Sequence, residues 1–351
     1  MTRVDGQMND IRAIRPEAKA ARGVSDTEER RACFPFVVGH GRSGTTMLRL
    51  MLNAHPDLAI PNESHFIPHL ARRWNVSNDT GQARWVAFAD ALGRHHRFVS
   101  WGLPDSEVRE ALAHADPASY SDAIRCVYAL YAGHQGKWRY GDKTPSYVLN
   151  MPSLAELFPE SRFVHIVRDG RDVALSLMEV DFGPDSIDEA ALRWRRSVRQ
   201  GRRVGGLLGP GRYLEVRYET LVAEPGDVLP RICSFLDLRF DEAMLRYFET
   251  AGSALRGMND RQRGHHPNVH SPPTVGIRDW RRQMNSAQVA AFEAIAGDAL
   301  EELGYPRSVR RFTVSQVARG QRAKLRFRLA HARGRVAKAK RKLRAAARLS
   351  R

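Results

Sequence analysis

The run Gly39-His40-Gly41-Arg42-Ser43-Gly44-Thr45-Thr46 combines glycines, a cation and hydroxyl groups at a spacing that can bind an anion. A glycine loop that leads from a strand into a helix turns backbone N–H groups and the helix N-terminus toward a bound anion. In nucleoside triphosphatases this loop has the frame G-x-x-x-x-G-K-[ST], whose lysine reaches the phosphates. Here Thr45 stands at the lysine position. The loop therefore indicates a ligand other than a magnesium-bound triphosphate.

Side chains of the loop can add to the backbone donors. The guanidinium of Arg42 presents paired N–H groups that match the oxygens of a sulfate or a phosphate. The hydroxyl groups of Thr45 and Thr46 supply further donors. A tight turn that uses glycine only for its conformation does not account for this set of residues.

Two residues downstream of the loop can act as a base toward a hydroxyl group. Glu63 follows Pro61-Asn62, and its carboxylate can accept a proton if burial raises its pKa toward neutrality. His65 lies two residues further on and is the competing base, because the unperturbed pKa of histidine suits the role. We favour Glu63, and His65 stays open as the alternative.

Short apolar runs on either side of the candidate residues predict a parallel sheet. The run Phe34–Val38 precedes the loop, and residues 44–54 have a helical pattern after it. Phe163–Val167 and residues 213–218 are further strand candidates. Strands that alternate with helices are typical of a mostly parallel sheet covered on both faces. Since ligands bind at the carboxyl ends of such strands, the loop, residues 142–144 and residues 168–171 should share one rim.

The remaining elements surround this sheet. We predict a polar leader at 1–31, a main domain at 32–306 with a helical insertion at 84–132, and a basic helical or disordered tail at 307–351. Further predictions are a short strand at 137–140, helices at 152–158, 226–237, 241–250 and 286–303, a long loop at 256–275, and a basic helix at 330–348.

Two segments together resemble a known family, the sulfotransferases that use 3′-phosphoadenosine 5′-phosphosulfate (PAPS). Gly41–Thr46 is similar to the family's 5′-phosphosulfate loop, and Phe163–Ser176 (FVHIVRDGRDVALS), about 125 residues on, is similar to its 3′-phosphate motif. The segment Arg42–Pro68 resembles the protein-tyrosine sulfotransferase branch in particular, and we expect a bacterial member. The resemblance covers roughly residues 34–305 and implies a three-layer α/β fold like that of P-loop nucleoside triphosphatases.

The resemblance also implies roles for individual residues. Arg168 and Ser176 would bind the 3′-phosphate of PAPS, while Arg171 is expected on a solvated face. Lys143, in Gly141-Asp142-Lys143-Thr144-Pro145, matches a family lysine that stabilises charge on the leaving phosphate. Gly41, Arg42, Ser43, Gly44, Thr45 and Thr46 would form the rest of the donor site, with Arg42 also stabilising the transferred group.

Other matches concern the base and the nucleotide. Glu63 matches the catalytic glutamate of the tyrosine-sulfating branch. Tyr218, Arg278 and Arg281 resemble later elements that contact the adenine nucleotide, the two arginines as 3′-phosphate ligands. This chain departs from the branch at Asn62, where the branch has an acid, and at His65, where it has a base. The acceptor is therefore left as a carbohydrate, a lipid, a phenol or a tyrosine.

The composition limits the class of protein. The 351 residues are 42% hydrophobic and 27% charged, and their three cysteines are too few and too widely spaced for a disulfide framework or a zinc site. The histidines at 265, 266 and 270 fit a metal motif poorly, so no metal is expected. The N-terminal residues lack the apolar stretch of a signal peptide. We therefore expect a cytoplasmic protein, with peripheral association at the inner membrane face as an option.

The net charge of +17 comes from one end of the chain. Residues 307–351 hold 17 Lys and Arg and no Asp or Glu, whereas residues 1–306 hold 39 basic and 39 acidic residues. Such a tail can be a solvated extension, can bind an anionic membrane surface, or can bind nucleic acid or another polyanion.

The sequence thus predicts a PAPS-dependent sulfotransferase that acts in line on a hydroxyl group. Glu63 would be the general base, and Lys143 and Arg42 would stabilise charge in the transition state. A P-loop kinase for a small molecule and a non-catalytic nucleotide-binding module are the alternatives. The missing loop lysine argues against the kinase.

Overall fold

The computed structural model describes residues 32–75, 81–181, 183–255, 267–329 and 332. The chain divides into two compact units, one of residues 1–168 and 200–275 and the other of residues 169–199 and 276–351. The leader predicted at 1–31, residues 256–266 of the predicted loop and nearly all of the helix predicted at 330–348 lie outside the described residues. No helix among the described residues is both long enough and apolar enough to span a membrane.

The first unit is built on a four-stranded sheet with the order β4-β1-β5-β6. Its strands are β1 (Phe34–Gly39), β4 (Asp142–Lys143), β5 (Ser161–Val167) and β6 (Tyr213–Arg217). Every pairing is parallel, and Val37 lies opposite both Lys143 and Val164 in register. The carboxyl ends of β1, β4 and β5 therefore meet at one edge. This confirms the predicted α/β fold with a mostly parallel sheet.

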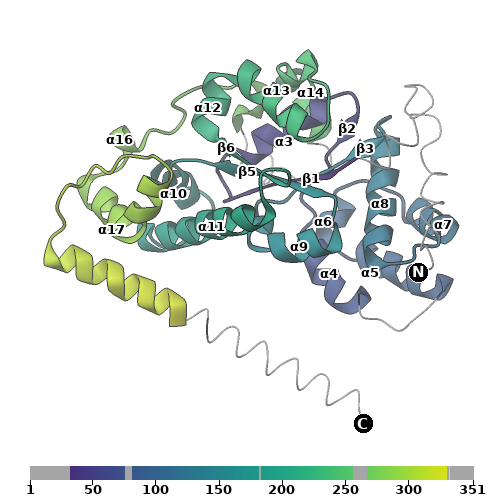
Figure 1. The fold of residues 1–351 in the computed structure, drawn as a ribbon, viewed down its shortest axis with the longest axis horizontal. Coiled ribbons are helices and arrows are strands. Elements are labelled where there is room, and N and C mark those ends of the chain that lie inside the picture. Colours follow the sequence, from purple (N-terminus) through teal and green to yellow (C-terminus); the bar gives the residue numbers. More distant parts are fainter. Residues whose placement is uncertain (1–31, 76–80, 182, 256–266, 330–331, 333–351) are drawn as a thin grey trace, which may run out of the picture. The chain divides into compact units, whose positions relative to one another are not determined.

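Side chains alternate between the two faces of the sheet and are buried on both. Phe34 and Phe36 point into a core formed with α8 and α9, while Val37 points into a second core formed with α3 and α13. Burial on both faces explains why β1 is a nearly continuous apolar run. Figure 1 shows α12, α13 and α14 above the sheet and α9 below it.

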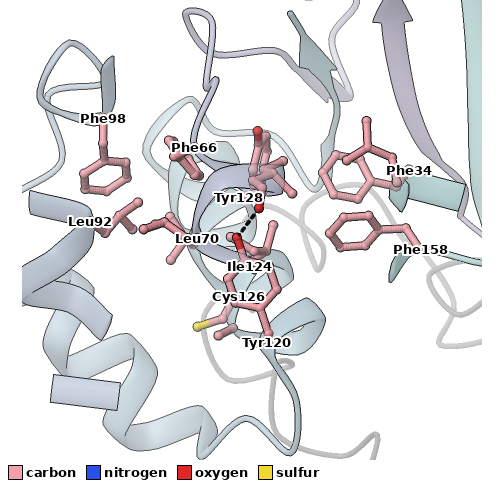
Figure 2. Packing of buried hydrophobic residues seen from close by; sticks show 14 of the residues in the cluster. Phe34, Phe66, Leu70, Leu92, Phe98, Tyr120, Ile124, Cys126, Tyr128 and Phe158 are labelled. Atoms are coloured by element: carbon pink, nitrogen blue, oxygen red, sulfur yellow. Dashed lines mark hydrogen bonds between the residues drawn. The ribbon is translucent and has the colours of Figure 1, made fainter. Parts of the chain in front are cut away.

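The helices of the first unit cover these two faces. They are α3 (Thr45–Ala54), α4 (Ile67–Trp74), α5 (Gln82–Gly93), α6 (His96–Val99), α7 (Asp105–Ala115), α8 (Tyr120–His134), η2 (Pro145–Leu149), α9 (Met151–Leu157), α12 (Tyr218–Ala223), α13 (Pro225–Phe235), η3 (Glu242–Met244), α14 (Tyr247–Ala254) and η4 (Pro267–His270). Helices α5 to α8 occupy the region of the predicted insertion. Figure 2 shows the aromatic core that joins them to β1, where Phe34 packs against Phe158 with ring centroids 5.0 Å apart.

Several predicted elements differ from the structure. The strand predicted at 137–140 is the two-residue β3 (Arg139–Tyr140), which pairs with β2 (Leu58–Ala59) in a separate small sheet. The helix predicted at 241–250 is two elements, η3 and α14. The sequence patterns above do not predict α11 (Ile187–Leu208), a helix of 22 residues whose last turns belong to the first unit.

The second unit holds the other helices. They are α10 (Gly170–Met178), the first part of α11, α16 (Trp280–Gln283), α17 (Ser286–Glu302) and a helix over residues 314–329. Helix α10 contacts both α16 and α17. Asn285 and Gln288 form a reciprocal capping box at the start of α17, which fixes where that helix begins.

Arg171 is the central ion of the second unit, and its expected position on a solvated face is wrong. The side chain is fully buried, with Nη2 2.7 Å from Asp169 Oδ2 and Nη1 2.7 Å from Glu293 Oε1. Nη1 also donates to the carbonyl oxygen of Pro306. The other oxygen of Glu293 accepts from the backbone N–H of Val309 at 2.9 Å. Arg171 therefore joins α10, α17 and the chain that follows α17.

Replacing Arg171 tests this network. We expect Arg171→Met to lower the free energy of unfolding by about 3–5 kcal/mol, because two buried carboxylates lose their cation. Urea denaturation measures the loss. The matched control is Arg282→Met, at a side chain that is 88% exposed, with an expected change below about 0.5 kcal/mol. Equal, small effects of both changes would contradict the role of Arg171.

Candidate functional site

The loop between β1 and α3 has a backbone shaped for close approach to a ligand. Arg42 and Gly44 both have left-handed backbones, with φ of 70° and 90°. A Cβ at Gly44 would lie 2.3 Å from the ring of Tyr218, so only glycine fits there. Gly44 caps α3 without a side-chain hydrogen bond, and the first turn carries no acid. The first amides of α3 lack partners within the helix and form its positive end, which favours an anion.

Three predicted donor-site residues of the first unit lie together. The ring of Tyr218, the first residue of α12, packs on Gly44 on one side. The guanidinium carbon of Arg168, directly after β5, lies 4.4 Å from the centroid of the same ring. Arg168 also donates to the carbonyl oxygen of Arg42 at 3.5 Å. Tyr218 thus connects the loop to Arg168 at the carboxyl edge of the sheet.

Ser43 offers a second sign of an anion site. Its side chain is buried, and its Oγ has no hydrogen-bond partner among the residues that the structure describes. A buried hydroxyl without a partner is costly and calls for an explanation. Gly41, by contrast, borders open space, since an added Cβ would touch nothing within 4 Å. A ligand bound at the loop could accept a hydrogen bond from the Ser43 hydroxyl and occupy the open space beside Gly41.

Lys143 brings an ammonium group to the start of α3, next to the loop that has Thr45 at its lysine position. It ends β4, its side chain is fully buried, and its Nζ lies 2.7 Å from Glu63 Oε1 and 3.4 Å from Thr46 Oγ1. Burial lowers the pKa of Lys143, and the adjacent Glu63 carboxylate opposes this. One ammonium group therefore contacts both the first turn of α3 and the candidate base.

Glu63 is held through both of its oxygens. Oε1 accepts from Lys143, and Oε2 accepts from His65 Nε2 at 2.9 Å. Since a carboxylate can only accept, Nε2 of His65 carries the proton in this contact. Burial acts to raise the pKa of Glu63, but Lys143 and His65 outweigh it and hold the pKa well below its usual range. The condition derived from the sequence, a Glu63 pKa raised toward neutrality, is therefore not met in this structure.

The segment around Glu63 is fixed by residues that the sequence did not single out as positioning groups. Ser64 Oγ lies 2.8 Å from the hydroxyl of Tyr147, and the N–H of Ser64 donates to Thr144 Oγ1. On the other side, Trp101 Nε1 donates to the carbonyl oxygen of Asn62 at 2.9 Å. Thr144 directly follows Lys143, so the same turn positions the cation and the base. The sequence signal that could have indicated this positioning role is the hydroxyl of Thr144, directly after Asp142-Lys143.

The remaining predicted residues belong to the second unit. Ser176 is buried in α10, and Arg278 forms an ion pair with Glu179, the residue after α10. Arg281 has its guanidinium carbon 4.7 Å from the centroid of the Trp280 ring. Their roles as 3′-phosphate ligands stay predictions.

Trp280 attaches its segment to the start of α10. Its Nε1 donates to Asp169 Oδ2 at 3.1 Å, and its backbone N–H donates to Asp172 Oδ1 at 2.8 Å. The guanidinium of Arg171 stacks on its ring at 3.7 Å. The two segments of the second unit that carry predicted phosphate ligands are therefore packed together.

Metal binding has no structural support in the part of the chain described here. Among those residues there is no group of three or more His, Cys, Asp and Glu side chains that could hold an ion. His265 and His266 lie outside the described residues.

Comparisons with known proteins agree on one family. A family model described as "Sulfotransferase family" matches residues 36–242. A Caenorhabditis briggsae protein that carries the protein-tyrosine sulfotransferase name is 26% identical over 285 residues, covering 78% of this chain and 89% of the relative. Protein-tyrosine sulfotransferase A of Caenorhabditis elegans is 24% identical, covering 80% and 69%. The sulfotransferase domain of the Synechococcus PCC 7002 olefin synthase aligns with a TM-score of 0.55 and 26% identity, covering 78% and 94%.

The pairing of Glu63 with Lys143 predicts a pH-dependent contribution to stability. A carboxylate whose folded pKa is lowered stabilises the fold above its unfolded pKa, about 4.3, and loses this as the pH falls toward the folded value. We expect Glu63→Gln to cost about 2 kcal/mol at neutral pH. The cost should shrink steadily below about pH 4.3.

Urea denaturation at a series of pH values measures this difference. Glu156→Gln, at an exposed glutamate of α9, is the matched control and should change stability little at any pH. A cost at Glu63 that does not depend on pH would contradict the pairing.

Proposed function

Because this chain belongs to the sulfotransferase family and transfers a sulfuryl group to a hydroxyl acceptor, we propose that its donor is PAPS. The residues present fit that donor. The amides at the start of α3, the buried Ser43 hydroxyl and the hydroxyls of Thr45 and Thr46 provide donors for its phosphosulfate. PAPS supplies the sulfuryl group on a good leaving phosphate, so the protein has to bind, orient and neutralise charge.

The position of Lys143 carries the proposal. Its ammonium lies 2.7 Å from the Glu63 carboxylate and 3.4 Å from Thr46, on the helix turn that would bind the phosphosulfate. A cation at this point can stabilise charge that develops on the leaving oxygen. Arg42, in the same loop, is proposed to stabilise the transferred group. Arg168 and Tyr218 are proposed to contact the nucleotide, with Ser176, Arg278 and Arg281 at its 3′-phosphate.

Glu63 is proposed as the general base. Its lowered pKa means that the carboxylate is ionised at neutral pH and is ready to accept a proton. The same pairing makes it a weak base while Lys143 holds it. If Lys143 turns its hydrogen bond toward the leaving oxygen, the chief cause of the lowered pKa is removed and Glu63 becomes more basic. Donor binding and base activation would then be coupled through one ammonium group.

His65 is proposed to orient Glu63 through Oε2, leaving Oε1 to Lys143 and the acceptor. Several relatives carry the name protein-tyrosine sulfotransferase. A tyrosine is therefore one acceptor to test, together with carbohydrates, lipids and other phenols. The family match gives no support to the kinase or to the non-catalytic module.

For the tail at 307–351 we propose association with an anionic surface. The cytoplasmic location stays a prediction.

Gly44→Ala tests the donor site. We expect at least about tenfold weaker binding of adenosine 3′,5′-bisphosphate, because a Cβ at 2.3 Å from Tyr218 must displace the ring or the loop. Isothermal titration calorimetry measures the affinity. The control is Gly206→Ala in α11, where an added Cβ meets nothing within 4 Å. No binding of the bisphosphate by the unaltered protein would refute PAPS as donor.

Glu63→Gln tests the base. With labelled PAPS and a panel of carbohydrate, lipid, phenol and tyrosine-peptide acceptors, we expect transfer to fall about 10²–10⁴-fold while bisphosphate binding persists. Glu156→Gln serves again as the control. His65→Asn, which tolerates the left-handed backbone at this position, should retain more activity than Glu63→Gln. The reverse order of effects would assign the base to His65.

A further inference from the structure

The helix at 314–329 is fixed to the second unit through one face. Gly320 is buried, and a Cβ there would lie 2.8 Å from the carbonyl oxygen of Ala294 in α17. Arg319 Nε donates to Asp188 Oδ2 at 2.8 Å, near the start of α11. The helix, drawn in yellow in Figure 1, is therefore docked along a defined side.

The opposite face of this helix is apolar and exposed. Its four large aliphatic side chains are Val314 (89% exposed), Val317 (47%), Leu325 (57%) and Leu329 (49%). At about 100° per residue they fall within an arc of roughly 120°, which leaves out both Gly320 and Arg319. Aliphatic side chains gathered on one face indicate a binding surface rather than scattered exposure.

Positive charge surrounds this apolar face. Residues 310–329 contain seven Lys and Arg and no acid. By the same helical geometry Arg322 borders the stripe on one side and Lys324 on the other. Arg328 and Gln321 fall inside the arc. Their side chains are long enough to place the polar end groups away from the apolar stripe. The helix thus has an apolar stripe with basic margins.

We propose that this face of the 314–329 helix lies in the headgroup region of an anionic lipid bilayer. Such a surface offers an apolar layer for Val314, Val317, Leu325 and Leu329 and negative charge for their basic neighbours. Nucleic acid would neutralise the basic side chains but would leave the four aliphatic side chains exposed to water. A second copy of the helix would bring like charges together. The inference deepens the proposed role of the tail and does not depend on sulfuryl transfer.

Charge and apolar contact have to be separated in the test, because residues 333–351 add further basic residues. The double change Val317→Ser/Leu325→Ser keeps every charge and removes two members of the stripe. With the full chain and vesicles of phosphatidylglycerol and phosphatidylcholine, we expect about tenfold weaker binding in cosedimentation. The matched control is Val99→Ser/Leu207→Ser, at two exposed residues of the first unit, and should bind like the unaltered protein.

A second readout reports insertion directly. The three native cysteines are buried, so Leu325→Cys can be labelled selectively with an environment-sensitive dye. We expect a blue shift of its emission with anionic vesicles, little shift with pure phosphatidylcholine, and none for a dye at Leu207→Cys.

Unchanged vesicle binding by the Val317→Ser/Leu325→Ser variant, or no blue shift at position 325, would overturn the proposal. Tight binding of a DNA duplex together with either of those results would assign the charge to nucleic acid instead. Binding of adenosine 3′,5′-bisphosphate should be equal in all variants. Failure of this inference is therefore distinct from failure of the donor assignment.

Discussion

A buried charge must be paired, and the candidate site is organised around the ammonium group of Lys143, whose side chain is fully buried. Desolvation of an unpaired ammonium would cost several kcal/mol. Glu63 meets this requirement at 2.7 Å, and Thr46 adds a weaker contact at 3.4 Å. The short strand β4, the start of α3 and the segment that carries Glu63 must therefore converge for the fold to be stable. The same convergence brings together the groups that we propose for sulfuryl transfer.

The sheet could be predicted from the sequence, because the signals of its strands are local. Phe34–Val38 and Phe163–Val167 are apolar runs long enough for buried strands, and parallel strands place their carboxyl ends at one edge. The resemblance added Tyr218, whose ring lies against Gly44, and Arg168, whose guanidinium lies over the same ring. Helix α11 was missed because of its glycines, which are poor helix formers. Gly201 and Gly205 are needed there, since a Cβ would lie 2.4 Å from His165 and 2.5 Å from Tyr213.

Partners that are distant in the chain set both the pKa of Glu63 and the position of Arg171. The pKa of Glu63 is lowered mainly by Lys143, a residue 80 positions away, whereas burial alone would have raised it. Arg171 was expected on a solvated face, but its side chain is buried between Asp169 and Glu293. A local pattern indicates which residues can ionise. Only the folded arrangement of their partners decides whether they do so in water or in the interior.

The ion pair of Arg171 with Glu293 has a consequence for the order of events during synthesis. The two residues are 122 positions apart, and Glu293 in turn accepts from the backbone of Ser308 and Val309. Helix α10 leaves the ribosome long before Glu293 does. Arg171 therefore has only Asp169 as a partner at first. The second unit can close only after residues 293–309 have emerged. Until then Arg171, in the segment with the predicted 3′-phosphate motif, has only one of its two buried carboxylate partners.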